Sequence, residues 1–275
     1  MGGWKSETLR SARKFHMTLS DSFIQSLIKR IDSSEVIGIG IVGSYARGQE
    51  NQYSDVDVDI FVSRLPEKPY DRYTLRYWED KLISLKYTLL EDERSALTNP
   101  RRAIWTVPGL HGMKILLDRD GSMAALQKAA FDFDWPPLQP AANEFAAEEI
   151  MGNAEEAHKI LNGLARGHES TVLYATWGLV KNMLEAVAVQ RGILIVSENS
   201  YFELIQDAVG RDSEWTNAFR TAWGLDPASS QYQARGAAAL RLYCLSAAMF
   251  DVLIPEKHRA VVDRTLQVIK DAGYS

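Results

Sequence analysis

Cysteine is almost absent from this sequence, since Cys244 is the single one among 275 residues. A chain with one cysteine has no internal disulfide framework, and its five histidines are scattered rather than spaced with cysteines as zinc ligands. These facts exclude disulfide-stabilised secreted domains and Cys/His zinc modules. The same scarcity is typical of the reducing cytosol, so we expect a cytoplasmic protein.

Long hydrophobic runs are also missing. Nowhere does the sequence contain the eighteen or so consecutive apolar residues of a transmembrane helix. The first five residues, Met1 to Lys5, contain no apolar signal core. We therefore expect no membrane partner and no signal segment.

An excess of basic residues is lacking as well. The chain has 31 Lys and Arg against 36 Asp and Glu, for a net charge of −5. Proteins that grip long nucleic acids usually carry a basic face, so this balance argues against a nucleic-acid partner. It is compatible with a cationic small substrate. Hydrophobic residues make up 46% of the chain, which allows one large or two modest domains with real cores.

The most informative stretch runs from residue 43 to residue 62 and alternates acids with apolar residues. Asp55, Asp57 and Asp59 are separated by Val56 and Val58, and the apolar residues continue to position 62. Alternation at period two predicts a half-buried strand with the acids on one face. Neighbouring acids repel one another unless a cation sits between them, and carboxylate oxygens suit Mg²⁺.

A second apolar run of strand length, 36–42, ends at Gly43-Ser44. Gly43 allows a tight turn and a close backbone approach to a ligand. Ser44 opens a short segment with helical character, where a hydroxyl and amide groups could hold a phosphate. A strand, a Gly-Ser turn, a short helix and an acidic strand therefore place phosphate donors beside a metal-binding edge. Phosphoryl or nucleotidyl transfer needs this equipment.

Gly43-Ser44, ten further residues and then Asp55-Val56-Asp57 resemble the signature of the DNA polymerase β-like nucleotidyltransferase superfamily. The Gly-Ser-x-Ala-Arg-Gly start and the Ser-Asp-x-Asp ending look most like the antibiotic nucleotidyltransferases and the minimal nucleotidyltransferases. The resemblance covers about twenty residues. It implies an α/β (α+β) nucleotidyltransferase domain with a mixed sheet, followed by an all-α helical-bundle domain.

The resemblance also implies site residues. Asp55 and Asp57 would hold Mg²⁺, while Gly43 and Ser44 would contact the β- and γ-phosphates of ATP or another NTP. Two basic residues, Arg47 on the short helix and Lys181 in a later helix, could reach the same triphosphate. For each of these two, a role at the surface is the alternative.

A third catalytic carboxylate is expected from the family, and Asp118 is our candidate for it as a metal ligand. Asp118 ends a predicted strand over 113–118, and the alternative is that it starts the turn to Gly121. The usual place for the acid is earlier in such a strand, where this chain has Lys114 and Ile115. Three acids on a preceding element are further candidates: Glu91, Asp92 and Glu93.

Additional residues have weaker signals. A general base could come from the first helix after the linker, at Glu144, Glu148 or Glu149; the alternative, which the sequence favours for each, is a solvated helix face. Asp59 could orient the site or line the acceptor cleft. Aromatic residues near the motif could stack a base or a sugar ring, and these are Tyr45, Tyr53 and Trp105.

Apolar spacing predicts the remaining elements. A helix capped by Ser20 or Asp21 precedes the first strand. Helical spacing returns over 70–85, a strand follows over 86–90, and two more strands occupy 103–107 and 113–118. The proline-rich stretch 132–140 marks the domain boundary. Helices are predicted after it, at 141–165, 169–191, 200–209, 213–222, 228–253 and 256–272. We therefore expect domains at 1–135 and 141–275.

Three functions fit these patterns. The leading hypothesis is a Mg²⁺-dependent enzyme that moves AMP from ATP to a hydroxyl of a small molecule, an aminoglycoside-like antibiotic, and releases pyrophosphate. The second is a protein adenylyltransferase or antitoxin-like minimal nucleotidyltransferase, although such proteins are usually shorter. The third is a non-catalytic nucleotide-binding module. A homodimer is compatible with all three.

Overall fold

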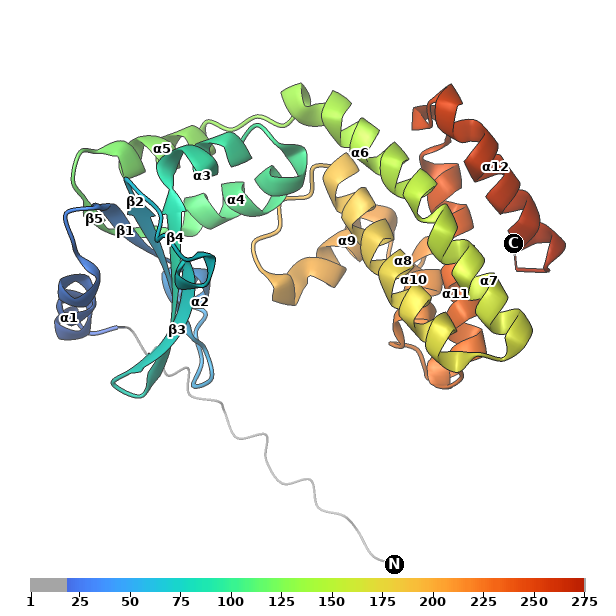
Figure 1. Cartoon of the computed structure of the whole chain (residues 1–275), viewed down its shortest axis with the longest axis horizontal. Helices are drawn as coiled ribbons and strands as arrows, with labels where there is room; N and C mark the ends of the chain where they lie inside the picture. The colour runs from blue at the N-terminus through green and yellow to red at the C-terminus, as the bar shows by residue number, and fades with distance from the viewer. Residues whose placement is uncertain (1–18, 275) are drawn as a thin grey trace, which may run out of the picture. The chain divides into compact units, whose positions relative to one another are not determined.

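The structure is a computed structural model that describes residues 19–274 (Figure 1). The predicted absence of a signal core at residues 1–5 lies outside this range. Two compact units make up the described chain. The first comprises the residues up to Asp92 together with Gly109–Lys128, and the second comprises Glu93–Pro108 together with the residues from Ala129 onward. No helix in the described range is long and apolar enough to cross a membrane.

The first unit is built on a five-stranded sheet with the order β3-β4-β2-β1-β5. Its strands are β1 (Val36–Val42), β2 (Val56–Val62), β3 (Tyr73–Trp78), β4 (Lys81–Leu89) and β5 (Lys114–Asp118). β2 and β4 are parallel, whereas every other neighbouring pair is antiparallel. The predicted mixed sheet is therefore confirmed.

Helix α1 (Asp21–Ile31) covers one face of this sheet. Its first turn is capped by Ser20, whose side chain accepts the amide of Phe23, as the sequence predicts. Three buried residues on one side of the helix join the core residues of the central strands: Phe23, Leu27 and Ile31. The short helix α2 (Gly43–Arg47) packs into the same core through Tyr45 and Ala46. The opposite face is thus the one left for the acids of β2.

The helix predicted over 70–85 is wrong. These residues form the hairpin of β3 and β4, which turns at Glu79 and Asp80 with φ of 48° and 62°. Positive φ at both central residues is the turn geometry that suits the twist of paired strands. Apolar residues at 75, 78, 82 and 85 do follow helical spacing. Pairing of β4 with β2 along seven residues overrides that local signal.

The strand predicted over 103–107 is also wrong, because these residues lie in helix α4 (Pro100–Gly112). The side chain of Asn99 accepts the amide of Arg102 at 3.2 Å, and Pro100 stands at the first helical position. Helix α3 (Leu90–Ala96) follows β4 directly. The strand predicted over 113–118 is confirmed as β5.

The rest of the described chain is helical. This was predicted for the residues after the proline-rich stretch but not for 122–131, and the helix predicted over 141–165 is interrupted between Gly152 and Ala154. The long elements are α5 (Ser122–Phe131), α6 (Gln139–Gly152), α7 (Ala154–Arg166), α8 (Glu169–Gln190), α9 (Tyr201–Val209), α10 (Glu214–Trp223), α11 (Tyr232–Met249) and α12 (Glu256–Asp271). Apolar faces of α6–α12 form one core in the second unit. The proline-rich stretch contains a single 3-10 turn, Pro136–Leu138. A domain boundary at 135–141 stays a prediction.

Glycine in β1 makes room for methionine on the acid-bearing face. A Cβ on Gly38 would stand 2.6 Å from Cγ of Met123 and 2.9 Å from the carbonyl oxygen of Leu117. We predict that Gly38→Ala lowers the free energy of unfolding by roughly 1–3 kcal/mol, because overpacking forces side chains and backbone to shift. Urea denaturation measures this change.

Gly109→Ala is the matched control, since nothing lies within 4 Å of a Cβ at that position of α4. Alanine there should be neutral or stabilising, because glycine costs roughly 0.5–1 kcal/mol in a helix interior. Equal effects of the two substitutions would contradict this packing account.

Candidate active site

The three acids of the motif lie at the start of β2 on one face of the sheet. Asp55 directly precedes the strand, and Asp57 and Asp59 follow at alternate positions. All three are partly exposed, whereas Val56 and Val58 between them are fully buried on the other side. This confirms the predicted strand and its two faces.

The turn at Gly43 lies directly against Asp57. Val42, the last residue of β1, pairs with Asp57 across the sheet, so the chain turns beside that acid. Gly43 has φ of +68°, and a Cβ on it would overlap Oδ2 of Asp57 and stand 3.0 Å from its Cγ. The Asp57 carboxylate therefore occupies the space that any other residue at position 43 would fill. Backbone conformation and contact both require glycine here.

Helix α2 presents polar groups next to this contact. The Ser44 carbonyl oxygen accepts the amides of Gly48 and Gln49, while the Ser44 hydroxyl makes no hydrogen bond to any other group in residues 19–274. Arg47 donates from Nε to Oε1 of Gln49 at 3.1 Å. The hydroxyl and the guanidinium thus remain available to an anionic ligand beside the acids.

Lys114 is a feature of this site that sequence analysis did not assign. It begins β5, and its Nζ donates to the backbone oxygen of Tyr45 at 3.2 Å. This bond ties α2 to the edge of the sheet and brings a cation to the Gly43–Arg47 turn. The hydrogen bond from Lys114 to Tyr45 exists because Lys114 pairs with Ile41 across the sheet. That pairing joins segments far apart in the sequence, so no local pattern predicts it.

The structure does not bring Asp118 to the other acids. Gly38 pairs with both Asp118 and Phe61, so Asp118 is level with a residue four positions beyond Asp57 along β2. At about 3.3 Å per residue this is roughly 13 Å along the strand direction.

The Asp118 carboxylate is also engaged elsewhere. It accepts the amides of Gly121 and Ala124 at 3.0 Å and that of Met123 at 3.3 Å. It therefore holds the turn to Gly121, which was the alternative for this residue, and it also caps the start of α5. We withdraw it as a metal ligand.

Of the other candidates for a third carboxylate, Glu91 and Asp92 follow the far end of the sheet too, and Glu93 belongs to the second unit. Glu91 and the acids after it follow Leu89, which pairs with Val62, whereas Asp57 pairs with Ser84. On β5, the residue level with Asp59 is Ile115, because both pair with Gly40. This position therefore has no carboxylate. Within residues 19–274 there is no group of three or more His, Cys, Asp or Glu placed to hold a metal.

Two carboxylates are nevertheless a suitable donor set for one particular ion. Mg²⁺ is often bound through one or two carboxylates together with water and substrate phosphates. Asp55 and Asp57 are two positions apart on one face, and the turn beside Asp57 begins with Gly43, which has no side chain to block a ligand. The residues present therefore fit a Mg²⁺ ion that arrives with a phosphate ligand.

The remaining candidates near the motif differ in exposure. Tyr45 is a core residue at 6% exposed, which leaves no face for stacking, while Tyr53 is 87% exposed. Ser84 and Lys86 on β4 stand beside Asp57 and Asp59. The sequence did not predict these two neighbours, because a helix was expected at Ser84 and nothing local showed that the strand predicted from Lys86 onward pairs with β2.

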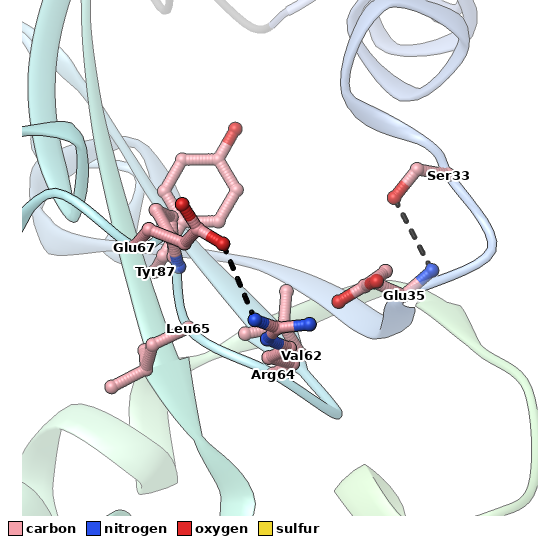
Figure 2. A pocket seen from close by; sticks show the side chains of 8 residues that line it. Ser33, Glu35, Val62, Arg64, Leu65, Glu67 and Tyr87 are labelled. Carbon is pink, nitrogen blue, oxygen red and sulfur yellow. Dashed lines mark hydrogen bonds and ion pairs between the residues drawn. The ribbon is translucent and has the colours of Figure 1, made fainter.

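A pocket of about 310 Å³ opens at the opposite end of β2, at Val62 (Figure 2). Figure 2 shows Arg64 beside Glu67, with an ion pair of 3.3 Å between them. Tyr87 also lines this pocket, and burial raises the pKa of its hydroxyl. The pocket lies at the end of the strand away from Asp57, so it is separate from the candidate site.

The remaining candidates belong to the second unit, including Trp105, which the sequence had suggested near the motif. Lys181 on α8 has its Nζ 5.7 Å from the centre of the Trp177 ring. Glu144 and Glu148 are exposed and line a pocket of about 320 Å³ with residues from the start of α12. Trp105 packs on Tyr201 with ring centres 5.4 Å apart. Roles for these residues at a nucleotide stay predictions.

Glu149 lies in a polar cluster of the second unit. Arg101 donates from Nε and Nη2 to the two carboxylate oxygens of Glu185, at 2.5 and 3.1 Å. Burial, then repulsion by Glu185, raises the pKa of Glu149, and a hydrogen bond from Asn153 and the charge of Arg101 oppose this. Glu149 is thus the candidate general base whose environment favours proton uptake.

Comparisons with known proteins identify a nucleotidyltransferase domain in the first part of the chain. Residues 24–107 match the family model of the nucleotidyltransferase domain, a range that contains the turn at Gly43 and all three acids of β2. "Putative protein adenylyltransferase MJ1305" of Methanocaldococcus jannaschii is 31% identical over 106 residues, which cover 36% of this chain and 70% of that protein. The crystal structure of a nucleotidyltransferase-like protein from Exiguobacterium sibiricum 255-15 is similar at 15% identity, over 90% of this chain and 78% of that one, with a TM-score of 0.48.

The contact between Gly43 and Asp57 can be tested with two alanine substitutions. Gly43 and Gly48 both have positive φ, of 68° and 66°, but nothing lies within 4 Å of a Cβ on Gly48. Gly48→Ala should cost only the backbone strain of roughly 1–2 kcal/mol. Gly43→Ala should cost a further ~1–3 kcal/mol from overpacking against Asp57. Denaturant unfolding of both variants measures the difference, and equal costs would show that the contact is absent.

The raised pKa of Glu149 has a stability consequence with a definite sign. Because the folded-state pKa lies above the unfolded value, ionisation of Glu149 opposes folding, and this cost grows as pH rises through the folded pKa. Glu149→Gln should therefore raise the free energy of unfolding at pH 7, and the gain should vanish near about pH 4, around the ordinary pKa of Glu. Denaturation at several pH values measures this. A gain that is the same at every pH would contradict this account.

Proposed function

This chain belongs to the nucleotidyltransferase family, and we propose that it transfers AMP from ATP to an acceptor hydroxyl in a Mg²⁺-dependent reaction. The observation that supports this most strongly is the packing of the Asp57 carboxylate against the bare backbone of Gly43. This packing places Asp57, which would bind the metal ion, next to the turn at Gly43, which would bind the phosphates. The choice of AMP draws on the adenylyltransferase named among the similar proteins.

The residues of the site divide into two groups by charge. Asp55 and Asp57 would hold Mg²⁺, which when bound neutralises charge on the phosphate oxygens. The Ser44 hydroxyl and the Gly43 amide would donate to the β- and γ-phosphates, and the Arg47 guanidinium would pair with the same oxygens. Lys114 would add a second positive charge beside the turn. These groups orient the triphosphate so that its α-phosphorus faces the acceptor.

In the transfer itself, the acceptor oxygen forms a bond to the α-phosphorus. The bond from that phosphorus to the oxygen bridging to the β-phosphate breaks, pyrophosphate leaves, and the hydroxyl proton passes to solvent or to a nearby base. Most of the catalytic effect would come from positioning and charge neutralisation.

Two classes of acceptor follow from different observations. The motif resemblance suggests a small hydroxylated molecule, an aminoglycoside-like antibiotic. The 31% identity with a protein named as a protein adenylyltransferase favours a protein hydroxyl instead. A nucleotide-binding module without turnover is a third reading, which the lack of a third acid among residues 19–274 favours.

We predict that Asp57→Asn abolishes Mg²⁺-dependent release of pyrophosphate from ATP, with a loss of about a hundredfold or more, because several kcal/mol of charge stabilisation would disappear. The fold should persist, since Asp57 is a partly exposed residue outside the buried core. Incubation with labelled ATP, Mg²⁺ and either an aminoglycoside panel or candidate proteins measures the release and shows where the label goes.

Asp118→Ala is the control for this experiment. It removes a helix cap, so it should lower stability by roughly 1 kcal/mol. It should leave turnover unchanged, because Asp118 lies at the other end of the sheet. Wild-type turnover in the Asp57 variant, or loss of turnover in a folded Asp118 variant, would contradict the proposed site. ATP binding without turnover in the wild type would favour the binding-module reading.

A further inference from the structure

The acid-bearing face of the sheet continues without interruption onto the β3 edge. The register of β2 with β4, and of β4 with β3, places side chains of the three strands in rows on one face. The rows are Asp57–Ser84–Leu75 and Asp59–Lys86–Tyr73, and Tyr77 lies on the same face two residues beyond Leu75. Strands lie about 4.8 Å apart, so the acids and the β3 side chains are separated by roughly 10 Å across this face.

The three β3 side chains on this face stand in solvent, and we call them the β3 stripe: Tyr73, Leu75 and Tyr77. Their exposed fractions are 56%, 51% and 76%. Side chains this exposed project from the surface instead of lining a cavity. Same-face residues are about 7 Å apart along a strand, so the stripe is roughly 13 Å long. One member is fixed, because Ser84, beside Asp57, donates from Oγ to the Tyr73 hydroxyl oxygen at 3.2 Å.

β3 is also the last strand of the sheet on its side, and no strand among residues 19–274 pairs with its outer edge. Such an edge exposes a row of main-chain donors and acceptors, which another extended chain can pair with. Natural proteins usually protect an edge of this kind with prolines or bulges, or by covering it. β3 has apolar side chains and no proline, so it suits strand addition by a partner.

The charge around this edge differs in sign from that of the whole protein. Residues 68–86 contain five Lys and Arg and three Asp and Glu, a local net charge of +2, whereas the chain as a whole has −5. Arg72, Arg76 and Lys86 are among the exposed basic residues of this segment. A partner that is complementary to this edge is therefore acidic.

We propose that the β3 stripe binds the acceptor of the transfer reaction, and that this acceptor is an acidic, extended polypeptide segment. This inference rests on the proposed function and names its substrate class. A small molecule usually binds in a concave pocket, whereas exposed tyrosines beside an open strand edge are typical of contacts with another protein. An added strand would lie about 14 Å from β2, three strand spacings away. The hydroxyl that accepts AMP therefore belongs to the part of the partner that continues across the face toward Asp57.

An array of degenerate peptides tests this proposal. Each peptide holds a fixed Tyr, Ser or Thr, and the flanking positions are enriched in either acidic or basic residues. The full chain is incubated with the array, Mg²⁺ and ATP labelled at the α-phosphate. We expect about tenfold more label on acidic than on basic peptides, and N-methylation of alternate peptide amides should remove it because strand pairing is then blocked.

Leu75→Thr keeps a residue type that favours strands and removes the central apolar group of the stripe. It should raise KM for the best peptide about fivefold or more, with KM for ATP unchanged. Leu225→Thr is the matched control, a leucine of similar exposure (44%) outside the first unit, and it should behave as wild type.

The proposal is overturned if acidic and basic peptides are labelled equally, or if the two leucine variants have the same KM for peptide. It is also overturned if an aminoglycoside is labelled and no peptide is. A protein that releases no pyrophosphate with any acceptor would instead refute the proposed function, on which this inference depends.

Discussion

The candidate site depends on one contact, in which the carboxylate of Asp57 rests against the backbone of Gly43. The pairing of Val42 with Asp57 sets it up, because β1 ends and the chain turns directly beside the acid. Because Gly43 has no side chain, the Asp57 carboxylate can lie directly against the turn. A single methyl group at position 43 would overlap it. A negative group and a set of hydrogen-bond donors are thereby held side by side, which is the arrangement that a metal-bound phosphate requires.

The sheet around this contact has two unlike faces. One face is covered by α1 and α2 and forms the core of the first unit. On the other, glycines in β1 admit Met113 and Met123, while β2, β4 and β3 carry polar and exposed side chains in register. The parallel pairing of β2 with β4 determines this arrangement, because it places the hairpin of β3 and β4 next to the strand that carries the acids. The same pairing leaves β3 as an edge with tyrosines in solvent.

Family membership supports the transfer chemistry but leaves the acceptor open. The matched range, residues 24–107, contains the whole Gly43–Val62 motif. The helical unit has its own buried core and a polar cluster in which Arg101 pairs with Glu185 and Glu149 is held by Asn153. Burial, together with the charge of Glu185, makes Glu149 take up a proton more readily than an acid in water, a property that suits either a structural or a catalytic role.

Local patterns in the sequence determined the central part of the fold. The alternation of acids and valines predicted β2, the cap at Ser20 predicted the start of α1, and apolar spacing predicted the helices after residue 139. These elements could be predicted because each signal lies within a few neighbouring residues. The proximity of Gly43 and Asp57 was also inferred, since both belong to one short motif.

Only the tertiary structure decided the rest. Residues 70–85 have helical spacing but form strands, because β2 offers a partner that no local pattern reveals. Asp118 has the right chemistry for a metal ligand, yet the register of β5 places it at the far end of the sheet, where it caps α5. Strand register depends on contacts between segments distant in the chain, and a shift along a strand moves a side chain away from its partners. For that reason the sequence could supply the two acids and the turn of the site, but not the position of Asp118, the tie from Lys114 or the stripe on β3.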